Sequence, residues 1–219
     1  MALFIKNTSV AIMILISSSL IVNAQTSNQL FSSQEYKSTE MSAFKKWANL
    51  KTRHKNETES RKLNTINNQC RLSKNFKCMN EEWQDVIKKL SSSTPEAMMN
   101  GINRHLNQAA YVSDWSNWQQ QDYWATLSQF FYKDGDCEDY AIAKYYSLKE
   151  LGFDENKMRI VVVHDTNLDV AHAVLAVYLK DKIWILDNQN SQVINDDQIQ
   201  HYTPLYSINE NAWWFHKIS

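Results

Sequence analysis

The sequence has 219 residues, a formal net charge of −1 and 43% hydrophobic residues. This hydrophobic content excludes a disordered chain, and the balanced charge argues against a general binder of nucleic acids or anionic membranes. Only three glycines and two prolines occur, which disfavours a β-sandwich built on many tight turns.

The first 24 residues are typical of a cleaved secretory signal. Lys6 provides the positive charge of a short n-region, residues 10–22 are apolar, and Ala24 stands where a signal peptidase would cut. The apolar stretch is shorter than the roughly 20 residues that a membrane-spanning helix needs. An uncleaved anchor is the alternative. We expect residues 1–24 to be removed on export, leaving residues 25–219 as a single exported domain.

Three cysteines bear on the chemistry of an exported protein. Cys70 and Cys78 could form a disulfide in an oxidising compartment, and Cys137 would then be a free thiol. Two alternatives stay open, namely that Cys137 pairs with one of the others or that all three remain reduced.

Helical patterns dominate residues 25–112. We expect helices over residues 40–47, 56–70 and 81–90, followed by a helix that begins at Pro95 with Thr94 as its N-cap. Beyond residue 113, a short helix is expected over residues 122–131, a turn at Asp134-Gly135, and a strong helix over residues 136–151 that ends before Gly152.

Strand patterns follow Gly152. Residues 158–165, 171–179 and 182–188 are rich in β-branched and aromatic residues, and residues 204–216 could add a last strand. Because strands follow helices in blocks, we expect an α+β fold in which the helical N-terminal half packs on a C-terminal antiparallel sheet.

The sequence DGDCEDYA, residues 134–141, places Cys137 in the first turn of the long helix among four acidic residues. A helix N-terminus favours a thiolate, but neighbouring carboxylates raise the pKa of a thiol. A catalytic cysteine needs the thiolate. Either Cys137 is inert, or something neutralises the negative charge around it.

A histidine and an aspartate lie close together in the expected sheet. If Lys180-Asp181 forms a two-residue hairpin turn, Asp187 lies opposite Val174, two residues from His172 on the same face. A three-residue turn would shift the pairing by one residue, so that His172 and Asp187 would lie on opposite faces of the sheet. Cys137, His172 and Asp187 would then supply a nucleophile, a base and an acid that orients the base.

These residues resemble a known family. DGDCEDYA at a helix start, AHAVLAV on one strand and IWILDN on the next are similar to the bacterial transglutaminase-like cysteine peptidases. More narrowly, they are similar to the periplasmic LapG-type proteases that release adhesins. The resemblance covers residues 115–215 and implies a papain-like, transglutaminase-like core at about residues 113–219.

The resemblance also implies the residues of the site. The catalytic residues would be Cys137, His172 and Asp187. The family is calcium-dependent, which implicates the acids beside the cysteine, and oxygen ligands in a short stretch suit Ca²⁺. The expected calcium ligands are Asp136 and Glu138, with Asp139 and Asp134 as further candidates. The alternative is that these acids only favour a helix N-terminus.

By the same resemblance, the substrate would be the N-terminal region of a large surface adhesin, cut at a di-alanine site to control biofilm release. A cyclic-di-GMP-responsive inner-membrane receptor would sequester the protease through its periplasmic domain, with an exposed Trp124 as the expected docking residue. The alternative is that Trp124 packs in the core. Two other functions stay open: acyl transfer by a transglutaminase or amidase, and a non-catalytic calcium-binding periplasmic adaptor.

Overall fold

The computed structural model describes residues 29–63 and 79–218. The expected signal segment and the expected Cys70–Cys78 disulfide both lie outside these residues. Within the described part, Cys137 is a free cysteine, so it does not pair with another thiol. No helix in these two ranges is both long enough and apolar enough to cross a bilayer.

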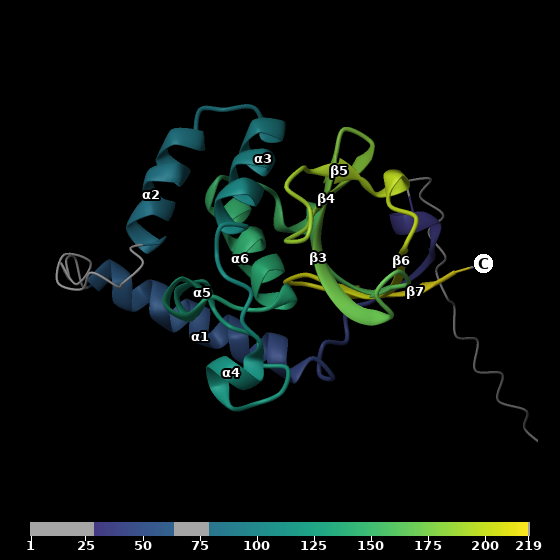
Figure 1. Cartoon of the computed structure of the whole chain (residues 1–219), viewed down its shortest axis with the longest axis horizontal. Coiled ribbons are helices and arrows are strands. Elements are labelled where there is room, and N and C mark those ends of the chain that lie inside the picture. Colours follow the sequence, from purple (N-terminus) through teal and green to yellow (C-terminus); the bar gives the residue numbers. More distant parts are fainter. Residues whose placement is uncertain (1–28, 64–78, 219) are drawn as a thin grey trace, which may run out of the picture.

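In the described part of the chain, six α-helices lie on one side and a strongly curled sheet lies on the other (Figure 1). The helices are α1 (Lys45–Leu63), α2 (Met79–Leu90), α3 (Pro95–Leu106), α4 (Asp114–Trp118), α5 (Leu127–Lys133) and α6 (Cys137–Glu150). The described residues also form the short 3₁₀ turns η1 (Leu30–Ser32), η3 (Glu155–Lys157) and η4 (Asp196–Gln198).

The sheet has seven strands in the order β1-β7-β6-β2-β3-β4-β5, and every neighbouring pair is antiparallel. The strands are β1 (Gln34–Ser38), β2 (Met158–Asp165), β3 (Val170–Leu179), β4 (Lys182–Leu186), β5 (Ile194–Asn195), β6 (Tyr202–Ile208) and β7 (Trp213–Lys217). The predicted α+β fold with a C-terminal antiparallel sheet is confirmed.

Several boundaries differ from the sequence predictions. The first helix begins at Lys45 rather than Glu40, and it is preceded by β1, an edge strand in a half that was predicted to be helical. Residues 204–216 hold parts of two strands, β6 and β7, because Asn209 accepts the backbone N–H groups of Asn211 and Ala212 and closes a turn between them. A short edge strand such as β1 has only a weak sequence pattern. Its strand conformation depends mainly on pairing with the neighbouring strand.

The helix predicted over residues 122–131 is also shifted. The structure places α5 at Leu127–Lys133, where Thr126 and Gln129 form a capping box that fixes the first turn. Residues 119–125, between α4 and Thr126, are therefore not helical, and Gln119 and Asp122 have positive φ values of 53°. The helices that begin at Pro95 and near Asp136 are confirmed, with Thr94 capping α3 and Gly152 following α6 at φ 89°.

Helix α6 lies between the other helices and the sheet (Figure 1). Its side chains from Asp139 to Leu148 are all buried, whereas the sequence predicted a single apolar face. The helix is enclosed because α3 and α5 cover it on one side and β2 and β3 cover it on the other. A helix surrounded in this way buries polar positions together with apolar ones.

The N-terminal helix α1 is tied to the C-terminal half. Trp47 is buried, and its indole Nε1 donates a hydrogen bond of 2.9 Å to the Asn209 carbonyl in the β6–β7 turn. The same ring packs edge-on against Tyr145 of α6 at a centroid distance of 6.0 Å. The N-terminal helices thus support the helix that carries Cys137.

The hairpin between β3 and β4 has the predicted two-residue turn. Lys180 and Asp181 have φ values of 53° and 58°, and Leu179 pairs with Lys182. Positive φ at both positions matches the right-handed twist of the flanking strands. The register therefore continues as predicted, with Leu175 opposite Leu186.

Gly135 lies in the turn before α6, where a side chain has no room. A Cβ atom at this position would lie 2.4 Å from Asp139 Oδ2 and 2.6 Å from Asp139 Cβ. Asp139 cannot move away freely, because it is fully buried and its Oδ1 accepts the backbone N–H of Ala125 at 2.7 Å.

We therefore expect Gly135→Ala to destabilise the fold by about 1–3 kcal/mol, the usual range for overpacking a buried site. Thermal unfolding would measure this loss. Gly101→Ala in α3 is the matched control, because its Cβ would meet only the end of the flexible Leu90 side chain and alanine favours a helix. Equal losses in both variants would contradict the special role of the Gly135 turn.

Candidate active site

Cys137 is the first residue of α6, and its half-buried thiol lies against strand β3. Asp136 is the N-cap residue, but its carboxylate makes no capping hydrogen bond to the helix. The backbone of Ala173, the residue after His172, acts to lower the pKa of the Cys137 thiol, against the larger effects that raise it. The thiol at the helix N-terminus is therefore held next to the strand that carries the histidine.

His172 and Asp187 form a direct pair at the end of the sheet. His172 is 4% exposed on β3, and its Nε2 lies 2.9 Å from Oδ1 of Asp187, which follows β4 and is also 4% exposed. The hairpin register accounts for this contact, as the sequence analysis predicted. Because Nε2 is engaged by Asp187, proton transfer falls to Nδ1, whose contact is a long one of 3.5 Å to the side-chain amide of Gln189.

Asp187 is held by more partners than the sequence indicated. Its Oδ2 accepts a hydrogen bond of 2.6 Å from the Tyr202 hydroxyl, and its Oδ1 accepts the Gln189 backbone N–H at 2.9 Å. Burial alone would raise the pKa of Asp187, but the hydrogen bonds from His172, Tyr202 and Gln189 outweigh it and lower the pKa. Asp187 therefore stays an anion beside the imidazole.

Tyr202 was missed by the sequence analysis. It lies on β6, and its ring centroid is 5.6 Å from that of His172. β6 is not a sheet neighbour of β3 or β4, since β2 separates it from β3. No local pattern could have brought Tyr202 to Asp187, because the contact depends on the curl of the whole sheet.

The thiol of Cys137 faces strong negative charge. Burial raises its pKa far above the ordinary range, and the carboxylates of Glu138 and Asp136 raise the pKa further. The thiol donates a hydrogen bond of 3.1 Å to Glu138 Oε2. Without a compensating cation, this arrangement keeps Cys137 protonated and hence a weak nucleophile.

Asp114, Asp136 and Glu138 form a compact carboxylate cluster. One oxygen from each of these three residues lies within 4.8 Å of the others. The backbone N–H of Asp114 donates to Asp136 Oδ2 at 3.2 Å, and Asp114 Oδ2 accepts the backbone N–H of Tyr123. Asp114 comes from α4 and was not predicted, since it precedes Asp136 by 22 residues.

The cluster fits a divalent cation. Oδ1 of Asp114 and Oδ1 of Asp136 are both buried and have no hydrogen-bond partner among the described residues. Burial and the neighbouring negative charges raise the pKa of Asp114 to about 6 and that of Asp136 to about 7. Buried carboxylate oxygens that repel each other and lack donors are the hard ligands that Ca²⁺ prefers.

Two of the predicted ligands are outside this cluster. Asp139 Oδ1 is engaged by Ala125, and burial raises the pKa of Asp139 well above its usual range. Asp134 is the C-cap residue of α5, and its Oδ1 accepts the backbone N–H of Ala110 at 3.2 Å. Asp139 Oδ2 is buried without a hydrogen-bond partner among the described residues, but neither Asp134 nor Asp139 belongs to the three-carboxylate cluster. Asp114 joins that cluster because the fold brings α4 to the start of α6.

The exposed position predicted for Trp124 is wrong. Trp124 is buried, packs against Trp47 at a centroid distance of 6.1 Å, and donates its indole N–H to Asp122. The exposed aromatic residues near the cluster are Tyr111, which is 62% exposed and bridges to Gly135, and Trp115, which is 60% exposed and follows Asp114.

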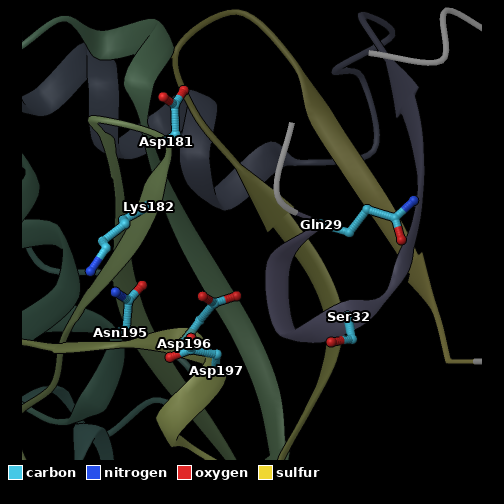
Figure 2. Close-up of a pocket in the computed structure, with 7 residues that line it drawn as sticks. All are labelled: Gln29, Ser32, Asp181, Lys182, Asn195, Asp196 and Asp197. Carbon is cyan, nitrogen blue, oxygen red and sulfur yellow. The ribbon is translucent and has the colours of Figure 1, made fainter. Parts of the chain in front are cut away.

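A separate pocket lies elsewhere on the sheet. Figure 2 shows Gln29 and Ser32 of the N-terminal segment on one side of it and Asn195, Asp196 and Asp197 on the other. Its lining does not include Cys137, His172 or Asp187. The candidate active site is therefore distinct from this pocket.

Comparison with solved structures gives three similar chains from Legionella pneumophila. LapG is 28% identical with a TM-score of 0.58, covering 63% of this chain and 77% of LapG. Calcium-bound LapG is 27% identical with a TM-score of 0.60, covering 65% and 81%. EGTA-treated LapG is 29% identical with a TM-score of 0.59, covering 64% and 77%. No curated protein matches the sequence significantly.

The family comparison agrees with the structural one. Residues 65–216 match the family model of the bacterial transglutaminase-like cysteine proteinases, and this range contains Cys137, His172 and Asp187. The match spans well over half of the chain. The protein therefore belongs to the bacterial transglutaminase-like cysteine proteinase family and has a LapG-like fold.

Proposed function

We propose that this protein is a periplasmic, calcium-dependent cysteine endopeptidase that cleaves the N-terminal region of a large surface adhesin at a di-alanine site. One observation carries the peptidase assignment: the His172–Asp187 pair at 2.9 Å lies beside the free thiol at the start of α6. The family supports proteolysis, and the likeness to calcium-bound LapG supports the role of calcium.

In the proposed mechanism, His172 is the base and Cys137 is the nucleophile. The thiol proton passes to Nδ1 of His172, because Nε2 is engaged with Asp187. The thiolate attacks the scissile carbonyl, and the imidazolium then gives its proton to the departing amine. The resulting thioester is hydrolysed when His172 removes a proton from water, and the second product leaves as a carboxylate.

The start of α6 also supports the transition state. The carboxylate of Asp136 does not cap the helix, so it leaves the first-turn N–H groups free of this side chain. The Cys137 backbone N–H is the donor that would face an oxyanion formed at the substrate carbonyl. Asp187 holds the tautomer of His172, and Tyr202 holds Asp187.

We assign the calcium ion to Asp114, Asp136 and Glu138. When bound, the dication would neutralise the carboxylates that raise the pKa of the Cys137 thiol. Glu138 would then no longer act as an uncompensated acceptor for the thiol proton. This assignment explains why acidic residues surround the nucleophile. Their negative charge disfavours the thiolate until the cluster binds a cation.

We expect the purified protein to cleave an N-terminal adhesin fragment in calcium, to lose this activity in excess EGTA, and to regain it on calcium addition. Cys137→Ala should be inactive under both conditions, because the nucleophile is missing. Product mass spectrometry would measure the cut. Equal cleavage in calcium and EGTA would contradict the calcium role, and full activity of Cys137→Ala would contradict the mechanism.

Failure to cleave in either condition, with folded protein and intact substrate, would instead favour another acyl acceptor or a binding role. Incorporation of an amine into a glutamine peptide would identify a transglutaminase. Calcium binding without any acyl chemistry would identify the adaptor.

The ligand assignment gives a separate prediction. Asp114→Asn should weaken calcium binding at least about tenfold, because calcium affinity follows the charge of its ligands. Isothermal titration calorimetry would measure the affinity. Asp134→Asn is the matched control, since its Oδ1 can still accept the Ala110 N–H and its carboxylate is outside the cluster. Weaker binding by Asp134→Asn alone would contradict the assignment.

We further propose that the periplasmic domain of a cyclic-di-GMP-responsive receptor docks beside the calcium cluster, with Trp115 as its contact. Trp115 is exposed and adjacent to a ligand, and a large exposed aromatic is the usual centre of a binding surface.

Trp115→Ala should weaken receptor binding about tenfold or more in surface plasmon resonance. Tyr132→Ala, an equally exposed aromatic on α5, is the control. Unchanged binding by Trp115→Ala would contradict this docking site.

A further inference from the structure

Three aromatic side chains form a row across strands β1, β7 and β6. Tyr36 on β1 pairs with Phe215 on β7, and Phe215 pairs in turn with Tyr206 on β6. The ring centroids of Tyr36 and Phe215 are 6.4 Å apart. Directly paired residues of neighbouring strands place their side chains on the same face of a sheet. We call these three residues the aromatic row.

The strand register connects the aromatic row to the active site. Tyr206 pairs with Val162 on β2, and Val162 pairs with Ala173 on β3. Ala173 directly follows His172 in the sequence. A single line of paired positions therefore runs across the sheet from the edge strand β1 to the residue next to the proposed base.

This line of positions lies on the face of the sheet that the helices cover. Leu175 lies two residues beyond Ala173, Ile208 lies two residues beyond Tyr206, and both belong to the core shared with α6. Residues two apart on a strand point to the same face. Helix α6 packs on this face against β2 and β3, and Cys137 is its first residue (Figure 1). The line and the nucleophile thus share one face of the sheet.

The outer part of the aromatic row is open to solvent. Phe215 is 49% exposed and Tyr36 is 48% exposed, whereas Tyr206 is half-buried and Ala173 is buried. The exposure therefore falls from the edge of the sheet toward the active site. Neighbouring exposed aromatic rings that lead into a site are typical of a surface that binds a ligand.

Tyr206 is the inner residue of the row. Phe44, which precedes α1, packs against its ring at a centroid distance of 5.6 Å. Burial raises the pKa of Tyr206 to about 12, and the negative charges of Asp122 and Glu138 contribute to the rise. Glu138 directly follows Cys137, so this electrostatic effect agrees with the position that the register gives to Tyr206.

We propose that the aromatic row is a substrate-binding strip, which holds apolar side chains of an extended polypeptide several residues away from the bond that is cut. This inference rests on the proposed function and adds a specificity surface to it. The ligand is a polypeptide because the row is continuous with the active site of a cysteine proteinase. Its apolar side chains would cover the exposed rings of Phe215 and Tyr36.

The reach of the strip follows from the geometry of the sheet. The strand order places four spacings between β3 and β1. Neighbouring strands are about 4.8 Å apart, so these spacings cover about 19 Å along the sheet. An extended chain advances about 3.3 Å per residue, so the strip reaches about six residues from the cut. A short peptide substrate ends before it meets Phe215.

The first experiment compares two substrates that share one cleavage site. Phe215→Ala should raise KM about tenfold for the adhesin fragment and leave kcat unchanged, because the strip binds the substrate away from the reacting atoms. A peptide with about three residues on each side of the same bond should show equal kcat/KM in wild type and variant. Equal losses with both substrates would indicate a distorted active site and overturn the proposal, as would no loss with either.

Matched variants separate binding from stability. Phe215→Tyr keeps the ring and should keep the wild-type KM. Tyr132→Ala removes a 64% exposed aromatic of α5 outside the row and should change neither substrate. Cross-strand ring pairs also stabilise a sheet, so thermal unfolding must show that each variant is folded. Tyr36→Ala should raise KM in the same way, and it replaces Phe215→Ala if that variant does not fold.

The second experiment measures binding without cleavage. Cys137→Ala should bind the fluorescently labelled adhesin fragment in an anisotropy titration, and adding Phe215→Ala should weaken this binding about tenfold. If the wild type does not cleave but the binding difference is present, the proposed reaction fails and the strip stands. Cleavage by the wild type without a binding difference would overturn the strip alone. A dimer that Phe215→Ala converts to a monomer in analytical ultracentrifugation would assign the row to a second copy and also overturn it.

Discussion

Repulsion among carboxylates at the N-terminus of α6 is the constraint on which the rest of the site depends. Asp114, Asp136 and Glu138 bring one oxygen each to within 4.8 Å, and the Cys137 thiol donates to one of them. Like charges this close in a partly buried place raise each other's pKa and that of the thiol. A helix N-terminus contributes only about half an elementary charge, which cannot balance three carboxylates. A bound dication can, and this is why we propose that calcium controls the nucleophile.

The sheet supplies the other half of the site, His172 and Asp187, and leaves these two residues little conformational freedom. The two-residue turn at Lys180-Asp181 sets the register of β3 and β4, and that register brings His172 to Asp187. Tyr202 then reaches Asp187 across the curl of the sheet. The geometry of the pair is therefore fixed by backbone pairing rather than by flexible loops, which suits a base that must keep one tautomer.

The buried helix α6 connects the two halves of the site. The helix is enclosed by helices and sheet, so its polar side chains have few solvent-facing directions. Most of them find partners, as Ser147 does with Trp83 and the Ala143 carbonyl. Lys144 Nζ, Tyr145 Oη and Asp139 Oδ2 are buried and have no hydrogen-bond partner among the described residues. Burying such polar atoms without a partner costs stability.

The sequence by itself determined the elements that have strong local signals. The Thr94-Pro95 helix start, the long helix before Gly152 and strands β2, β3 and β4 follow from capping, periodicity and β-branched composition, and the hairpin parity placed His172 beside Asp187. Tertiary structure decided the rest. Asp114 and Tyr202 join the site from elements distant in sequence, Asp134 and Asp139 are not part of the three-carboxylate cluster, and Trp124 is buried rather than exposed. The physical reason is that local patterns report which residues share a helix or strand face, whereas the meeting of distant carboxylates and the burial of one tryptophan depend on how the completed layers pack.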